Sequence, residues 1–126
     1  MMKKVITIII TTVVTLIILG ISLYLLQASK YEVVSNLSSP SGPNNKGYNV
    51  DNNVVKINIG PKPNSCYHLE LKSVSIDKNK NVTIKIKDKV DKGMCSEWIV
   101  YPELTIRFKT DINNVKVYYE NTKSFL

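Results

Sequence analysis

The chain opens with a long apolar run that has no polar face. After Lys3 and Lys4, the segment Val5 to Leu26 holds twenty-two residues without a charge. At ~1.5 Å rise per residue such a helix spans ~33 Å, which matches a hydrocarbon core of ~30 Å. Ile, Val and Leu occupy every side of it, whereas a helix packed in water keeps one polar face. The pattern therefore predicts one transmembrane helix.

The flanks of this run predict its topology. Lys3 and Lys4 favour a cytoplasmic N-terminus, which places the remainder of the chain outside the cytoplasm. A cleaved signal peptide is the alternative, but its apolar region is normally ~7–15 residues and its cleavage site needs small residues. The best candidate site, Leu26-Gln27-Ala28, has a large Leu at the −3 position. We therefore expect residues 1–26 to be an uncleaved signal anchor in the cell membrane; cleavage would instead give a secreted domain.

The composition turns polar after the apolar run. Residues 27–53 are rich in Ser, Asn, Pro and Gly, most densely from Ser35 to Asn45, and offer little to bury. Such a composition is typical of a flexible linker. We expect residues 27–53 to be a stalk.

Beyond residue 53 apolar and polar positions alternate in short runs, the period of half-buried strands. A change of parity at Lys72-Ser73 indicates a β-bulge. The polar stretch Asp77–Asn81 is a hairpin loop, and Pro102, which cannot donate to a ladder, is expected to break a strand. The expected strands are Val54–Ile59, Tyr67–Ile76 with its bulge, Val82–Ile86, Trp98–Tyr101, Leu104–Phe108 and Val115–Tyr119.

Six short strands and no helical period after residue 30 predict the fold class. They indicate an all-β domain, a small sandwich or barrel, over residues 54–120. Residues 121–126 are expected to be a tail. Burial alone gives a domain of this size marginal stability, so a cross-link would matter.

Cys66 and Cys95 are the only cysteines, and both fall on the side placed outside. A pair in an oxidising compartment most often forms a disulfide, and closing a loop of this length would stabilise by roughly 3.5 kcal/mol. The alternatives are a metal site formed by the two cysteines and His68, or a redox pair of cysteines. The spacing of these residues in the sequence is typical of neither zinc sites nor redox motifs.

His68 is the single histidine, and strand alternation turns it away from Tyr67 and Leu69 towards solvent. No neighbouring residue supplies a nucleophile or an orienting carboxylate. The chain has no phosphate-binding Gly-rich loop, nucleophile elbow or metal signature. We therefore expect no catalytic residues, no cofactor and no metal.

Aromatic side chains are dense in the predicted β domain, and most are expected to pack within it. Tyr118 and Tyr119 point to opposite faces of a strand, so one is expected to be exposed. With His68 and Tyr101 they are the candidate interaction residues.

The net charge of +7 comes mainly from Lys, with Arg107 as the single arginine. Recognition of bases commonly uses Arg, so a solvated surface is a better interpretation than nucleic-acid binding. The expected partners are the lipid bilayer and a protein.

The segment Gly60 to Tyr67, of sequence Gly-Pro-Lys-Pro-Asn-Ser-Cys-Tyr, resembles the opening of the protease-complex PrcB C-terminal domain family. That family typically shows Gly-x-Lys/Arg-Pro-Thr-Gly-Gly-Tyr before a strand. A loop with Gly93, the pair Tyr101-Pro102 and a final strand from Val115 to Val117 extend the likeness over residues 54–120. Asn64-Ser65-Cys66 replaces Thr-Gly-Gly, and the family layout would bring Cys95 towards Cys66.

The resemblance implies an extracytoplasmic β module of bacterial envelope proteins, whose naming member stabilises a surface protease complex without catalysis. We therefore expect a membrane-anchored binding module, stabilising or regulating a partner such as a protease complex, and not an enzyme. One alternative is a membrane-tethered metal- or thiol-dependent enzyme. Another is a surface protein without a specific ligand.

Overall fold

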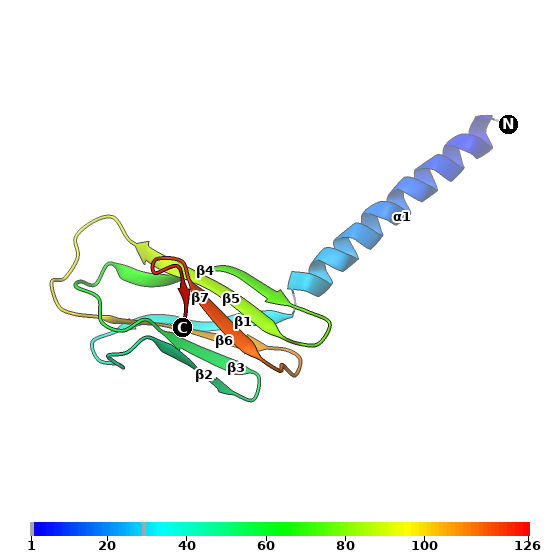
Figure 1. The fold of residues 1–126 in the computed structure, drawn as a ribbon. Helices are drawn as coiled ribbons and strands as arrows, with labels where there is room; N and C mark the ends of the chain where they lie inside the picture. The colour runs from blue at the N-terminus through cyan, green and yellow to red at the C-terminus, as the bar shows by residue number, and fades with distance from the viewer. Residues whose placement is uncertain (1, 29) are drawn as a thin grey trace. The chain divides into compact units, whose positions relative to one another are not determined.

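The structure, a computed structural model, describes residues 2–28 and 30–126, which form a helical unit and a β unit that begins at Tyr31 (Figure 1). Helix α1 (Met2–Ala28) confirms the helix expected over Val5 to Leu26. It is long and apolar enough to cross a membrane, properties that a signal sequence near an N-terminus shares. Two positions of the predicted anchor and stalk, Met1 and Ser29, lie outside the described residues.

Four threonines interrupt the apolar surface of α1, and each hydroxyl is satisfied within the helix. Each donates to the backbone carbonyl four residues earlier at 2.8 Å, an arrangement that holds for Thr7, Thr11, Thr12 and Thr15. A hydroxyl bonded in this way leaves no donor unpaired in hydrocarbon, where an unsatisfied polar group is costly. The threonines are therefore compatible with a membrane span.

Residues 31–126 form two four-stranded sheets, as far as the described residues show. The first has the order β1-β6-β3-β2 and the second β4-β5-β7-β8. Every pairing between these strands is antiparallel except that of β5 with β7. The strands are β1 (Tyr31–Ser39), β2 (Gly47–Asp51), β3 (Val54–Asn58), β4 (Tyr67–Ile76), β5 (Val82–Val90), β6 (Tyr101–Phe108), β7 (Val115–Tyr119) and β8 (Ser124–Phe125). The prediction of an all-β domain after one apolar helix is confirmed.

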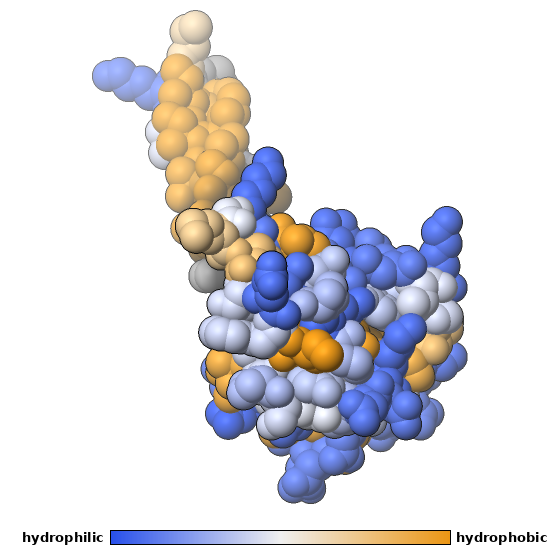
Figure 2. Space-filling view, turned by 90° about the vertical axis from the view of Figure 1, so that its left-hand side faces the viewer, coloured by the Kyte–Doolittle hydropathy of each residue, from blue (hydrophilic) through white to orange (hydrophobic). Residues whose placement is uncertain are grey.

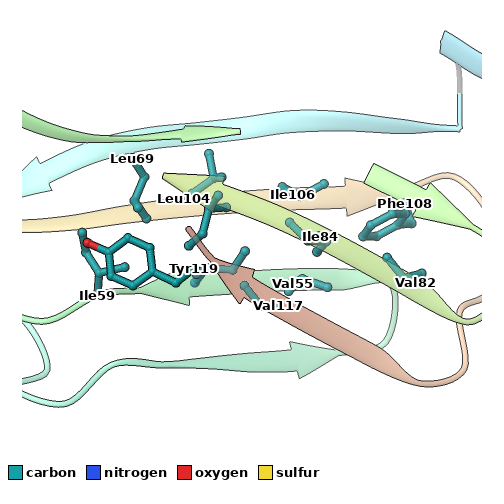
Figure 3. Close-up of a cluster of buried hydrophobic side chains, with 12 residues drawn as sticks. Val55, Ile59, Leu69, Val82, Ile84, Leu104, Ile106, Phe108, Val117 and Tyr119 are labelled. Atoms are coloured by element: carbon teal, nitrogen blue, oxygen red, sulfur yellow. The ribbon is translucent and has the colours of Figure 1, made fainter. Parts of the chain in front are cut away.

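Side chains from both sheets meet in one core (Figure 3). Alternate residues of β5 and β6 point inward, which accounts for the alternation of apolar and polar positions in these segments. Aliphatic residues and two aromatics make up the cluster: Val55, Ile57, Ile59, Leu69, Val82, Ile84, Ile86, Leu104, Ile106, Phe108, Val117 and Tyr119.

The predicted flexible stalk is wrong, because residues 31–39 and 47–51 are strands of the first sheet. Strand β1 pairs with β6 along nearly its whole length, and β2 pairs with β3. Both are edge strands, which need backbone partners on one side only and can carry polar residues outward. The amide of Asn36 and the hydroxyl of Ser38 also bond to backbone carbonyls of β4, so polar side chains join β1 to the second sheet.

Two further predictions at strand ends are wrong. Strand β6 runs through Pro102, which pairs with Ser38 of β1 but lies beyond the end of the β3 register, so no second neighbour needs its missing N–H. The expected tail at 121–126 contributes β8, which pairs with β7. By contrast, the bulge expected at Lys72-Ser73 is confirmed by a register shift between Leu71 and Ser73. The hairpin at 77–81 is confirmed as well.

Candidate functional site

The end of the β domain opposite Tyr31 collects most of its chemically interesting side chains. Strand β1 starts at Tyr31 opposite Phe108 and finishes at Ser39 opposite Tyr101. Its nine residues, at ~3.3 Å each, separate the two ends by about 30 Å. Three loops lie at the far end, which we call the distal end: residues 40–46, 59–66 and 91–100.

The longest of these connections, residues 91–100, is fastened to the 59–66 loop; we call it the distal loop. Cys66 and Cys95 lie at disulfide distance with their Cα atoms 5.4 Å apart, so the two cysteines meet as predicted. Beside them, the Ser65 amide donates to the Ser96 carbonyl at 3.0 Å, and the Ser96 amide donates to Ser65 Oγ at 2.7 Å. The Asp91 amide donates to the Cys66 carbonyl at 2.9 Å. The distal loop is therefore held at several points.

Three large apolar side chains of the distal loop are nevertheless exposed. Met94 is fully exposed, while Trp98 and Ile99 keep 64% and 55% of their surface accessible; we call these three residues the apolar tip. Figure 2 views the domain from this end and shows apolar surface among hydrophilic side chains. The strand predicted over Trp98–Tyr101 is wrong for its first two residues, because pairing begins at Val100, which bridges to Lys62, and continues at Tyr101 in β6.

His68 is not turned freely to solvent, as the sequence suggested, but lies between two polar side chains. Its Nδ1 is 3.1 Å from Ser38 Oγ, and its Nε2 is 2.7 Å from Asp91 Oδ2. These residues come from the end of β1, the start of β4 and the distal loop. The trio therefore ties both sheets and the loop together.

The composition of this trio matches a nucleophile, base and orienting carboxylate, but the serine hydroxyl also has a backbone partner. Ser38 Oγ donates its hydrogen to the Tyr67 carbonyl at 2.6 Å. The same Oγ lies 3.1 Å from His68 Nδ1, and which of the two atoms donates there depends on the tautomer of the imidazole. These contacts connect β1 to β4 and to the distal loop.

A second polar cluster lies deeper, under the distal end. Lys62 Nζ is 3.0 Å from Asp88 Oδ2 and lies 5.8 Å and 5.6 Å from the ring centroids of Tyr67 and Tyr119. The Tyr119 hydroxyl donates to Asp88 Oδ1. Burial raises the pKa of Tyr119 above its ordinary value, and the Asp88 carboxylate raises it further. Because Tyr119 is buried in the core, its prediction as an interaction residue is wrong.

The other candidate interaction residues occupy different parts of the domain. Tyr101 is half-buried at the start of β6, where its hydroxyl approaches Asn44 Oδ1 at 3.3 Å. Tyr118 is half-buried on β7, with its ring 5.3 Å from that of Phe125. No group of three metal-binding side chains occurs among residues 2–28 and 30–126. Cys66 and Cys95 face each other and not a shared site with His68.

Sequence reasoning missed the apolar tip and both partners of His68. Ser38 lies thirty residues before His68 in a segment whose polar composition is typical of a linker, so no local spacing marks the pair. The sequence predicts a strand through Trp98 and Ile99 because consecutive apolar residues are typical of buried strands. The sequence does contain a signal for this loop: Gly93 and Cys95, a glycine and a cross-link site, stand beside apolar residues that do not alternate with polar ones.

Comparison with known proteins found no matching family model, curated protein or solved structure.

Proposed function

We propose that this chain is a membrane-anchored, extracytoplasmic binding module: a non-catalytic β-sandwich that presents the distal loop to a protein partner. The observation that carries the proposal is the apolar tip, exposed on a loop fastened by the Cys66–Cys95 pair. The bilayer holds α1, and the module has no cofactor.

An exposed Trp next to other large apolar side chains is the composition of a binding hot spot. Trp is among the residues that contribute most at protein interfaces. A loop already fixed in one conformation also loses less entropy on binding than a free one. Exposed Met94, Trp98 and Ile99 cost solubility without adding to the core, and partner binding gives them a role.

The anchor determines where this surface works. Lys3 and Lys4 support a cytoplasmic N-terminus, and an oxidising exterior supports the Cys66–Cys95 bond. The resemblance to the PrcB C-terminal domain family supports a role in stabilising or regulating an envelope partner such as a protease complex. In this proposal the helix keeps the module near that partner and the distal loop contacts it.

Site-specific crosslinking in the native membrane tests the proposal. A photoreactive phenylalanine analogue replaces Trp98 or Met94 in the full chain, and mass spectrometry identifies the products. Leu37 is the matched control, because it is 57% exposed on β1 but lies outside the distal loop. We expect one recurrent protein adduct from positions 94 and 98 and none from position 37. Equal adducts from all three positions, or none from any, would contradict a binding role for this loop.

A further inference from the structure

We propose that the side chains of Lys62 and Asp88 join in an amide bond, an intramolecular isopeptide, and that the Tyr119 hydroxyl promotes the reaction. The bond adds a second covalent link to the β domain, besides the Cys66–Cys95 pair. This inference concerns a modification of the chain itself, and it stands or falls independently of the proposed binding role.

The two reacting groups are held together in an enclosed part of the domain. Lys62 Nζ is 3.0 Å from Asp88 Oδ2, and only 20% of the lysine side chain and 8% of the aspartate side chain is exposed. Backbone bonds fix both residues, because Lys62 pairs with Val100 and the Asp88 amide donates to Asn121 Oδ1 at 2.8 Å. Reacting groups held about 3–3.5 Å apart reach effective concentrations of roughly 10⁵ M or more.

The surroundings of the pair favour a neutral amide over two charges. The ring centroids of Tyr67 and Tyr119 lie 5.8 Å and 5.6 Å from Lys62 Nζ, and Tyr119 is buried in the core. Removing two charges from water is costly, and their mutual attraction offsets that cost only in part. Conversion of the pair to an amide removes both charges and releases one water molecule.

Tyr119 is placed to stabilise the charge that develops during the reaction. Its hydroxyl donates to Asp88 Oδ1, the oxygen that becomes negatively charged when Nζ attacks the carboxyl carbon. Burial raises the pKa of Tyr119, and the Asp88 carboxylate raises it further, so the hydroxyl stays protonated as a donor. A donor aimed at a developing oxyanion typically accelerates a reaction about a hundredfold.

The reaction uses only atoms of the two side chains. The Lys62 ammonium passes one proton to Asp88 Oδ2, and the neutral Nζ then attacks Cγ to form the new N–C bond. A second proton moves from Nζ to Oδ2, the Cγ–Oδ2 bond breaks, and Oδ2 leaves as water. Oδ1 returns to a carbonyl that still accepts from Tyr119, and Nζ keeps one hydrogen. One positive and one negative charge disappear together.

Intact-mass spectrometry of the full chain tests the proposal. The protein is purified from membranes in detergent, reduced and denatured, so that neither the disulfide nor an ion pair contributes to the result. We expect the wild type to be lighter than its sequence requires by one water molecule. Protease digestion should yield one peptide that joins the segments containing Lys62 and Asp88. A wild-type mass equal to that of the sequence would overturn the proposal.

Two conservative variants identify the lysine that is linked. K62R keeps the positive charge, but a guanidinium does not give up its proton, so this variant should lose no water. K56R is the matched control, because Lys56 Nζ is 3.3 Å from Glu103 Oε1 but 58% of the lysine side chain is exposed; it should show the wild-type deficit. A deficit that persists in K62R would place the dehydration elsewhere, such as a succinimide at an aspartate, and would contradict the assignment.

Tyr119→Phe tests the part assigned to the hydroxyl. A pulse of isotopically labelled amino acids marks newly made chains in cells, and the mass deficit of the labelled chains is followed with time. We expect the bond to form about a hundredfold more slowly in the variant than in the wild type. Near-ultraviolet circular dichroism checks that the variant is folded. Equal rates in a folded variant would show that Tyr119 takes no part in the reaction.

Discussion

Tyr119 shows how a single hydroxyl under the distal end links stability to pH. Burial and the neighbouring Asp88 carboxylate raise the pKa of Tyr119 above the ordinary value for tyrosine. A raised pKa in the folded state leaves the stabilisation fully present below the ordinary value of about 10 and removes it as the pH rises further. The free energy of unfolding should therefore fall at alkaline pH because Tyr119 ionises more readily in the unfolded chain.

Tyr119→Phe tests that linkage. Near neutral pH the variant should lose about 1.5 kcal/mol, because the hydrogen bond to Asp88 is absent. Between about pH 10 and 12 the wild-type free energy of unfolding should fall more steeply than that of the variant, by up to about 1.4 kcal/mol per pH unit. Urea unfolding of the full chain in lipid nanodiscs, followed by near-ultraviolet circular dichroism, measures both. Parallel pH profiles would contradict the assignment.

Ser38 carries a second prediction at this scale. Its hydroxyl contacts both the Tyr67 carbonyl and His68, so Ser38→Ala should lower the free energy of unfolding by about 1 kcal/mol. Ser39→Ala, one residue on along β1, is the matched control and should change little. A Ser38→Ala and His68→Ala double-mutant cycle should show coupling. Additive losses would mean that the two side chains act separately.

At the scale of elements, β1 is the longest strand that the sequence did not predict. Alternating Val and Ile revealed β5, whereas β1 carries Ser35, Asn36, Ser38 and Ser39, residues typical of linkers. Its pairing with β6 depends on backbone N–H and C=O groups, which every residue except proline carries. A pattern based on side chains could therefore predict the core strands but not this edge.

Hydrogen exchange distinguishes a strand from a linker in this region. Amides of β1 that pair with β6 should exchange at least a hundredfold more slowly than those of unstructured peptide, because exchange requires the sheet to open. The exposed 40–46 loop supplies an internal reference that should exchange faster. Equal, fast exchange across residues 31–46 would contradict the strand and support the prediction of a flexible stalk.

In the candidate site, too, the sequence could predict some contacts and not others. The meeting of Cys66 with Cys95 could be predicted because cysteines in an oxidising compartment pair with whatever cysteine is present. The meeting of His68 with Ser38 and Asp91 could not, because it depends on which strand edges lie together. Exposure of Trp98 likewise follows from the path of the loop, which alternation does not encode.

For the whole molecule, the Cys66–Cys95 pair is expected to decide whether the β domain stays folded. The two cysteines are separated by 29 positions in the sequence, so Cys66→Ser with Cys95→Ser should reduce the free energy of unfolding by roughly 3.5 kcal/mol. That is a large share of the stability of so small a domain. Urea unfolding with and without reductant measures the loss, and reductant should leave the double variant unchanged. A wild-type curve that reductant does not shift would contradict the prediction.

Parallel pairing of β5 with β7 has a consequence for how the protein is made. In the proposed topology the chain emerges outside the membrane from its N-terminal side, so Cys95 appears before β7. Core residues Val117 and Tyr119 belong to β7, and until they arrive the edge of β5 that receives β7 is open. The cross-link can therefore form before β7 arrives, and it reduces the number of conformations that the incomplete domain must sample to complete its fold. Until β7 pairs with β5, the open edge of β5 exposes the domain to envelope proteases and to aggregation.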